Sequence, residues 1–124
     1  MDVTPLIKSG QQVIQSYAGG QFKVSGTAYE GAVIVMPSGV ETWLVKDVSK
    51  LVLEDFQPLI AQAGDIDVVL LGCGKQIQFL QPDLRKSLKN NDLSVDVMDT
   101  GAACRTYNVL MAEERRVAAA LFPL

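Results

Sequence analysis

The second half of this chain alternates short apolar segments with segments of helical pattern, and this alternation constrains the fold most. Apolar segments at 67–71, 93–98 and 116–121 have the length of buried strands. Helical patterns at 82–89 and 101–112 separate them. Strands and helices that alternate in this way form βαβ units, whose right-handed crossovers lay helices over a sheet. The pattern therefore predicts the α/β class.

The first half of the chain has the pattern of strands and no helical period. Segments 11–18 and 21–25 flank Gly19-Gly20, a two-residue hairpin signal because glycine tolerates positive φ. The apolar run 30–36 predicts a buried strand, and 40–45 is expected to return antiparallel to it. These strands must extend the sheet of the second half or cover one of its faces. We therefore expect a mixed sheet, with parallel and antiparallel strands.

Two further segments carry predictions about local structure. Segment 53–64 predicts a short helix in which Asp55 is the N-cap and Pro58 lies in the first turn. Gly64 suits the position that follows the last helical residue. Residues 4–10 are expected to form a loosely attached lead-in to the first strand.

Length and charge exclude several classes of protein. The 124 residues fit one domain, which we expect to span residues 1–124. The net charge of −3 and the isoelectric point near 4.8 argue against a nucleic-acid binder that works through bulk electrostatics. No apolar run approaches the roughly 20 residues that span a bilayer, and the first residues lack the pattern of a signal peptide. We therefore expect a cytoplasmic protein without a transmembrane segment.

The residues that the chain lacks limit its chemistry. It contains no histidine, which excludes Ser-His-Asp and Cys-His catalysis and most zinc sites. Its two cysteines, Cys73 and Cys104, are too few for a disulfide-rich secreted framework. We therefore predict no metal and no cofactor, and we assign no catalytic residue.

The turn Gly72-Cys73-Gly74-Lys75 follows a predicted strand, where an open α/β sheet offers a crevice for ligands. Its backbone N–H groups can bind an anion, and Lys75 adds positive charge. The P-loop pattern and the third glycine of the Rossmann fingerprint are both absent. Two interpretations stay open here: a tight strand exit that needs glycine, or an anion site.

A second turn, Asp99-Thr100-Gly101-Ala102, starts the last helix directly after a strand. Helix N–H groups favour an anion there, whereas Asp99 repels one, and either Asp99 or Thr100 can cap the helix. Cys104, in the expected first turn beside Arg105, is either a thiolate nucleophile or a small buried residue. Cys73 and Cys104 can form a redox pair if they share a sheet edge. The candidate ligand-binding residues are Gly72, Cys73, Gly74, Lys75, Asp99, Thr100, Gly101, Cys104 and Arg105.

Four segments, at 71–75, 79–85, 97–110 and 116–121, carry a resemblance to a known family. The chain resembles the MTH938-like family, whose bacterial members are similar to the mitochondrial assembly factor 3 of NADH:ubiquinone oxidoreductase (complex I). The resemblance implies a central mixed sheet with helices packed on it and an additional β-layer from the N-terminal half. It implies no catalytic residues. Cys73 departs from the family, in which threonine is more frequent there, and this weakens the redox-pair interpretation.

Three functions follow from these observations. The first is a non-enzymatic binding or assembly protein that helps a respiratory membrane complex, complex I, to mature with a protein partner. The second is a small-molecule site, or an enzyme, in the crevice between residues 72–75 and 99–105. There Lys75 and Arg105 bind an anionic group and Cys104 is the only plausible nucleophile. The third is a redox sensor that uses the two cysteines.

Overall fold

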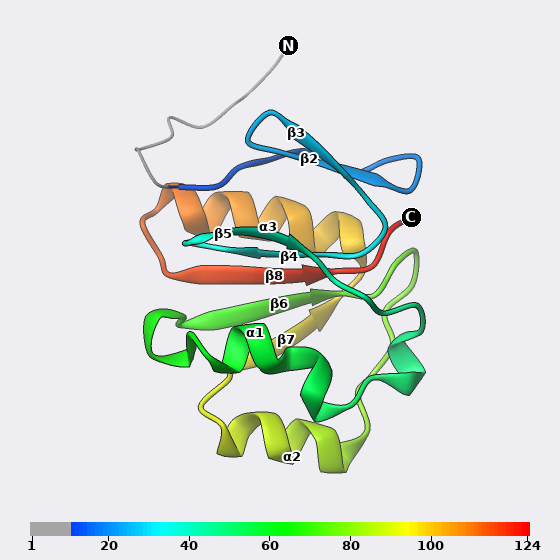
Figure 1. The fold of residues 1–124 in the computed structure, drawn as a ribbon, viewed down its shortest axis with the longest axis vertical. Helices are drawn as coiled ribbons and strands as arrows, with labels where there is room; N and C mark the ends of the chain where they lie inside the picture. Colours follow the sequence, from blue (N-terminus) through cyan, green and yellow to red (C-terminus); the bar gives the residue numbers. More distant parts are fainter. Residues whose placement is uncertain (1–10) are drawn as a thin grey trace.

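Two β-sheets organise the computed structural model, which describes residues 11–124 (Figure 1). The smaller sheet is an antiparallel meander in the order β1-β2-β3, and the larger has the order β5-β4-β8-β6-β7. The lead-in predicted at residues 4–10 lies outside the described part. The strands are β1 (Ile14–Ser16), β2 (Gln21–Val24), β3 (Thr27–Glu30), β4 (Val33–Met36), β5 (Gly39–Thr42), β6 (Val68–Gly72), β7 (Val95–Met98) and β8 (Val117–Leu121).

The larger sheet is mixed because its strands come from both halves of the chain. β6 pairs parallel with β7 and with β8, whereas β4 pairs antiparallel with β5 and with β8. Strands β4 and β5 therefore extend the sheet of the second half, and β1, β2 and β3 form an additional layer. This arrangement confirms the predicted α/β class, its mixed sheet and its extra β-layer.

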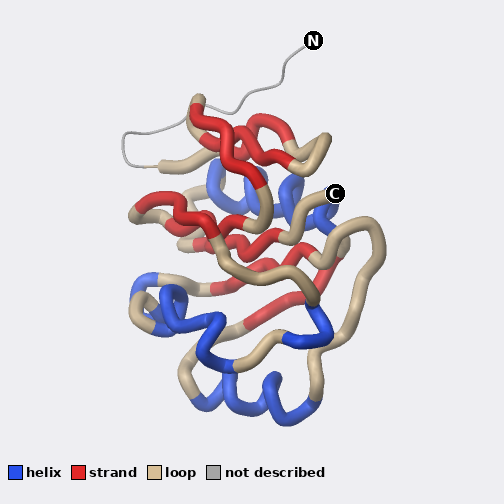
Figure 2. The backbone as a smooth tube through the Cα atoms, turned by 45° about the vertical axis from the view of Figure 1, so that its right-hand side comes forward, coloured by secondary structure: helices blue, strands red, loops and turns tan. Residues whose placement is uncertain are grey.

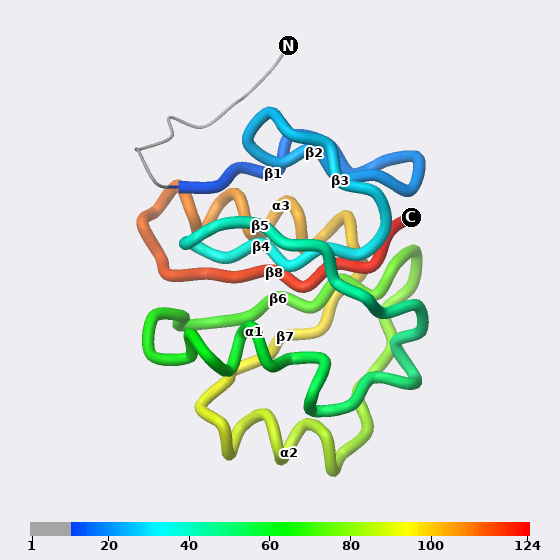
Figure 3. Tube along the Cα trace, in the orientation of Figure 1, coloured from blue at the N-terminus to red at the C-terminus, as the bar shows by residue number. Residues whose placement is uncertain are grey.

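Two helices cover opposite faces of the five-stranded sheet. α2 (Pro82–Asn90) connects β6 to β7, and α3 (Thr100–Ala112) connects β7 to β8, as the chain trace in Figure 3 shows. From β6 the chain moves to β7 at the edge of the sheet, and from β7 it moves back in the opposite direction to β8. Two crossovers of the same hand that run in opposite directions place their helices on opposite faces of the sheet. In Figure 1, α3 lies beside the three-stranded sheet and α2 lies at the other end of the molecule.

Each face of the five-stranded sheet has its own hydrophobic core, because successive side chains of a strand point to opposite faces. In β6, Val69 and Leu71 belong to the core that contains α2, and Leu70 belongs to the core that contains α3. The next strand, β8, contributes Ala118 and Ala120 to the α2 side. Their small side chains let the layer on that face pack close to the middle of the sheet.

Trp43 anchors the connection that follows β5. Its indole Nε1 donates to the carbonyl oxygen of Asp55 at 2.7 Å, so the only donor of the ring is satisfied. The ring meets Phe56 and Phe122 edge-on, with centroids 5.6 and 5.3 Å away. This aromatic cluster holds the connection between β5 and β6 against the core on the α2 side.

The single helix predicted over 53–64 is wrong. Figure 2 shows short helical pieces joined by loops between β5 and β6. The α-helical part covers only one turn and begins after Phe56. The helical segments are η1 (Val48–Lys50), η2 (Leu53–Phe56), α1 (Gln57–Ile60) and η3 (Ala63–Asp65), where η denotes a 3-10 helix.

Asp55 and Pro58 explain why the segment divides. Asp55 is not the N-cap of an α-helix; its carboxylate accepts the backbone N–H of Val52 at 2.9 Å, three residues earlier, and closes the turn of η2. Pro58 lies in the first turn of α1, as predicted, and its missing N–H cannot continue the bonds of η2 into α1. Gly64 lies within η3, and Ala61 takes the position that follows α1.

The strands of the first half differ from the prediction at one glycine. The turn at Gly19-Gly20 is confirmed, with φ of 69° and 75°. The predicted strand 30–36 is instead divided at Gly31, whose φ of 77° turns the chain between β3 and β4. β3 was therefore not predicted as a separate strand, since most of its residues lie between the predicted strands 21–25 and 30–36.

Candidate functional site

The two turns singled out by the sequence lie against each other. The backbone N–H of Gly74 donates to Oγ1 of Thr100 at 2.8 Å, and the N–H of Thr100 donates to the carbonyl of Gly74 at 2.9 Å. One residue earlier, the N–H of Cys73 donates to the carbonyl of Met98 at 2.9 Å. The parallel pairing of β6 and β7 brings their C-terminal ends to the same edge, which explains the meeting.

Thr100 closes the space between these turns. Its side chain is fully buried, and its hydroxyl also donates to the carbonyl of Phe122 at 2.7 Å. A methyl group added at Gly72 would lie 2.9 Å from Cδ2 of Leu121 and 3.0 Å from Cα of Thr100. Gly74 has a φ of 91°, which favours glycine. Both glycines are therefore needed for a close approach, and the inner part of the crevice is filled by protein.

Asp99 occupies the N-terminus of α3. Its carboxylate accepts the N–H of Ala102 at 2.9 Å, which confirms the predicted N-cap. Arg105 is exposed, donates to the hydroxyl of Tyr17 at 3.0 Å, and has its guanidinium close to the backbone of Gly101. The helix N-terminus thus already holds one negative group and one positive group. Anion binding by Arg105 and the exposed Lys75 stays a prediction.

Cys104 lacks the surroundings of a nucleophile. The helix begins at Thr100, so Cys104 lies in its second turn and not among the first free N–H groups. Its side chain is 1% exposed, and burial raises the pKa of the thiol to about 12, despite the lowering effect of Arg105. The thiol therefore stays protonated near neutral pH. The structure supports the interpretation of Cys104 as a small buried residue.

Cys73 and Cys104 lie in the two different cores, on opposite faces of the sheet. Both are free thiols. The Sγ of Cys73 donates to the carbonyl of Gln78 at 3.4 Å, and burial raises its pKa as well. The structure therefore does not bring the cysteines together, and the expectation of a redox pair at a shared sheet edge is wrong.

The polar side chains of α3 hold the three-stranded sheet. Asn108 accepts the N–H of Ile14 at 3.0 Å and donates to its carbonyl at 2.8 Å, as a neighbouring strand would. The hydroxyl of Tyr107 donates to the carbonyl of Gln12 at 3.1 Å, and burial raises the pKa of this phenol. Together with the bond from Arg105 to Tyr17, these contacts dock β1 on α3. The polar part of the segment 97–110 is thus a structural joint.

The sequence did not predict a groove of about 620 Å³ between α2 and β7. The signal that could have indicated it is the run of cations along the helix, at Arg85, Lys86 and Lys89. The position of β7 at the edge of the sheet could not be read from the pattern, because the order of strands is a property of the tertiary fold. The groove is lined by Leu80, Arg85, Lys86, Leu88, Lys89, Asp92, Leu93, Ser94, Val95 and Asp96.

Two searches of the described residues, 11–124, limit other kinds of site. No group of three or more cysteine or carboxylate side chains is placed to hold a metal ion within this range. None of the helices in this range has the length and apolar character needed to cross a membrane.

Solved structures identify the class to which this fold belongs. A crystal structure titled as an outer membrane protein from Bartonella henselae has a TM-score of 0.85 and 36% identity, covering 92% of this chain and 96% of that chain. The solution structure of a Bordetella pertussis protein, described as a Mth938-like domain, has a TM-score of 0.79 and 27% identity. It covers 99% of this chain and 92% of that chain. The fold is therefore that of the Mth938-like domains.

The family follows from the sequence match. A family model described as a protein of unknown function (DUF498/DUF598) matches residues 14–122, and the chain belongs to this family. The NADH dehydrogenase [ubiquinone] 1 alpha subcomplex assembly factor 3 of Danio rerio is 33% identical over 115 residues. This match covers 93% of this chain and 66% of the Danio rerio protein, so the chain spans less than two thirds of that relative. The resemblance to the MTH938-like family is confirmed.

Proposed function

We propose that this protein is a non-catalytic binding protein that assists the assembly of a respiratory membrane complex, the NADH dehydrogenase. The observation that carries the proposal is the match to the assembly factor of Danio rerio, at 33% identity over 93% of this chain. A match of this extent includes both the sheet and the helices on its two faces. The proposed action is contact with a protein partner, with no bond made or broken.

The chemistry of the described residues supports an action without catalysis. The thiols of Cys73 and Cys104 are buried, burial raises the pKa of both, and the chain has no histidine. The hydroxyl of Thr100 and the amide of Asn108 are engaged in internal hydrogen bonds. These buried groups thus stabilise the fold, and a role in assembly depends on the outer surface.

Deletion of the gene in the source organism tests the proposal. The expected result is a lower content of assembled NADH dehydrogenase in the membranes, seen on native gels and as lower NADH:quinone reductase activity, with restoration by the plasmid-borne gene. Succinate dehydrogenase activity in the same membranes is the control and should not change. An unaltered NADH dehydrogenase in the deletion strain would contradict the proposal. Cell fractionation of the same strains tests the expected cytoplasmic location.

A second candidate is an anion site on the outer side of the two turns, without catalysis. The observation that favours it is the exposed guanidinium of Arg105, which lies beside Gly101 in the first turn of α3. Titration with inorganic phosphate, followed through the amide resonances of residues 72–75 and 99–105, tests it. Saturable shifts that disappear in Arg105→Gln support this site, and the absence of shifts excludes it.

A further inference from the structure

Strand β7 is the edge of the five-stranded sheet on the α2 side and has no further strand beside it among the described residues. The carbonyls of Ser94 and Met98 accept the N–H groups of Val69 and Cys73 at 2.8 and 2.9 Å. Alternate residues of β7 therefore bond to β6. The residues between them, Val95 and Val97, direct their own N–H and C=O groups to the free edge.

The groove between α2 and β7 meets this edge at Val95 and Asp96, and leucine side chains lie at its base. Leu80, Leu88 and Leu93 line it and are 6%, 1% and 3% exposed, so they are packed into the core on the α2 side. The volume of about 620 Å³ falls within the range of about 300 to 1,000 Å³ that is typical of ligand clefts. Phe79 precedes the lining residue Leu80 in the sequence, and its side chain is 77% exposed. The groove thus combines apolar surface with open backbone groups.

The wall that α2 contributes is positively charged. Arg85 and Lys89 are one helical turn apart and line the groove with Lys86, and all three are exposed. None of them has an ion pair among residues 11–124. Two acidic residues, Asp92 and Asp96, also line the groove. Asp96 alternates with the valines of β7 that pack on the α2 side, so it borders the groove through the edge of the strand while its side chain is directed to the opposite face.

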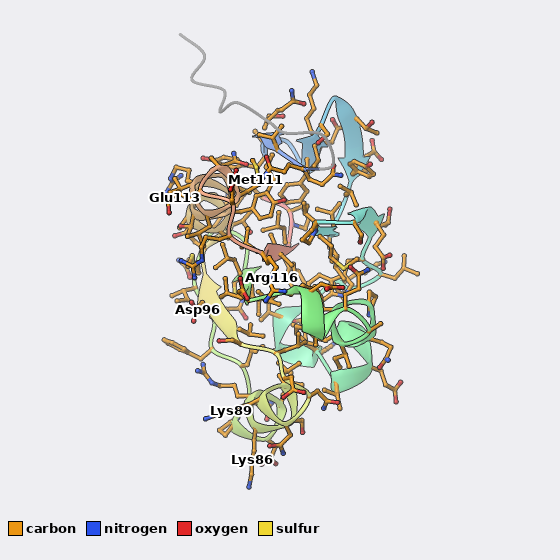
Figure 4. The ribbon with its side chains drawn as sticks, turned by 90° about the vertical axis from the view of Figure 1, so that its left-hand side faces the viewer. Lys86, Lys89, Asp96, Met111, Glu113 and Arg116 are labelled. Atoms are coloured by element: carbon orange, nitrogen blue, oxygen red, sulfur yellow. The ribbon has the colours of Figure 1, made fainter. Side chains whose placement is uncertain are left out.

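We propose that this groove binds an extended, acidic segment of a partner protein, which adds to β7 as a further strand and places carboxylates against the cations of α2. Figure 4 views this side of the molecule, with Lys86 and Lys89 on α2 below Asp96 on β7. The open edge selects an extended peptide, because a strand satisfies the outward N–H and C=O groups in order. The cations select its charge. This inference rests on the proposed function, whose class of partner it names.

A labelled peptide of alternating Glu and Val residues, about ten residues long, is the probe. A matched peptide carries Lys in place of Glu. Fluorescence anisotropy measures binding, and amide resonances of the full chain locate it. We expect the Glu peptide to bind with shifts at Val95 and Val97, and the Lys peptide to bind at least about tenfold more weakly.

Three variants sharpen the test. Lys89→Glu should weaken binding of the Glu peptide about threefold to tenfold, because it replaces attraction with repulsion. Lys23→Glu, on the exposed side of β2, makes the same change of charge and should leave the affinity unchanged. Val97→Pro removes an outward N–H that β6 does not use, and should abolish binding. If Val97→Pro does not fold, Lys89→Glu and Lys23→Glu still test whether the cations of α2 bind the peptide.

Equal binding of the two peptides, no binding of the Glu peptide, or shifts confined to another surface would each overturn this inference. The deletion experiment separates it from the proposed function. If the deletion strain lacks assembled NADH dehydrogenase but the peptide does not bind, only the proposal of a peptide site in the groove is wrong. If the peptide binds in the groove and the deletion has no effect on assembly, the groove stands as a peptide site and the proposed function fails.

Discussion

The hydroxyl of Thr100 connects three elements, and its removal is the sharpest test of the structure. It accepts the N–H of Gly74 at 2.8 Å and donates to the carbonyl of Phe122 at 2.7 Å, in a fully buried position. Thr100→Val replaces this hydroxyl with a methyl group and leaves both partners buried without a bond. Each buried group left unsatisfied costs about 1 to 3 kcal/mol. We expect a loss of about 3 kcal/mol in the free energy of unfolding.

Thr100→Ser is the matched variant, because it keeps the hydroxyl and removes only a methyl group. The expected loss is about 1 kcal/mol. Thr100→Val keeps the shape of the side chain better than Thr100→Ser does, but it is predicted to destabilise the fold more. At about 4 °C per kcal/mol for a chain of this size, Thr100→Val should lower Tm by about 12 °C.

Urea denaturation followed by the fluorescence of Trp43, the single tryptophan, measures these differences. Thr42→Val, at an exposed position of β5, is the control and should stay within about 0.5 kcal/mol of the parent protein. The reasoning would be refuted by a Thr100→Val protein as stable as the parent, or by a Thr100→Ser protein that is less stable than Thr100→Val.

Three further predictions follow from other contacts. Cys104 should resist alkylation in the folded protein at about pH 8.5, because its thiol is buried and its pKa is raised, and it should react in urea; reaction of the folded protein near this pH, like a free thiol, would contradict its burial. Asn108→Ala should cost about 2 kcal/mol and speed hydrogen exchange at Ile14, and unchanged exchange there would show that the amide does not hold β1. The hydrogen bond from Arg116 lowers the pKa of Asp67, so its stabilising effect is present above about pH 4 and is lost as the pH falls through the lowered value. Asp67→Asn should thus be less stable than the parent at neutral pH, by a deficit that shrinks as the pH falls below about 4, and a deficit that does not change with pH would be inconsistent with this pair.

The parts of the fold that could be predicted depend on local patterns. The run that contains Val33–Met36 is apolar throughout because β4 is buried on both faces. Asp99 followed by small residues indicated the start of α3, and the side chain does cap it. The division of the segment 53–64 was missed because it depends on which backbone group the carboxylate of Asp55 reaches. The surrounding packing determines which group the carboxylate reaches, and no periodic pattern in the sequence indicates it.

The sequence predicted where the two turns lie, whereas the interpretation of Cys104 as a nucleophile does not fit its burial. The sequence placed the turns at Gly72 and Thr100 at one sheet edge, and the structure joins them. It could not show that the side chain of Thr100 points inward, or that Cys104 is buried beneath β1 and β2. The groove beside β7 was missed because its edge position depends on the order in which distant strands pair.

The central claim is that this protein acts in assembly through binding and not through the chemistry of its thiols. The most direct measurement is the amount of assembled NADH dehydrogenase in membranes of the deletion strain that carries the variant Cys73→Ala/Cys104→Ala. The proposed function predicts that the deletion lowers this amount and that the cysteine-free protein restores it. A folded cysteine-free protein that fails to restore assembly, where the parent protein succeeds, would contradict the claim.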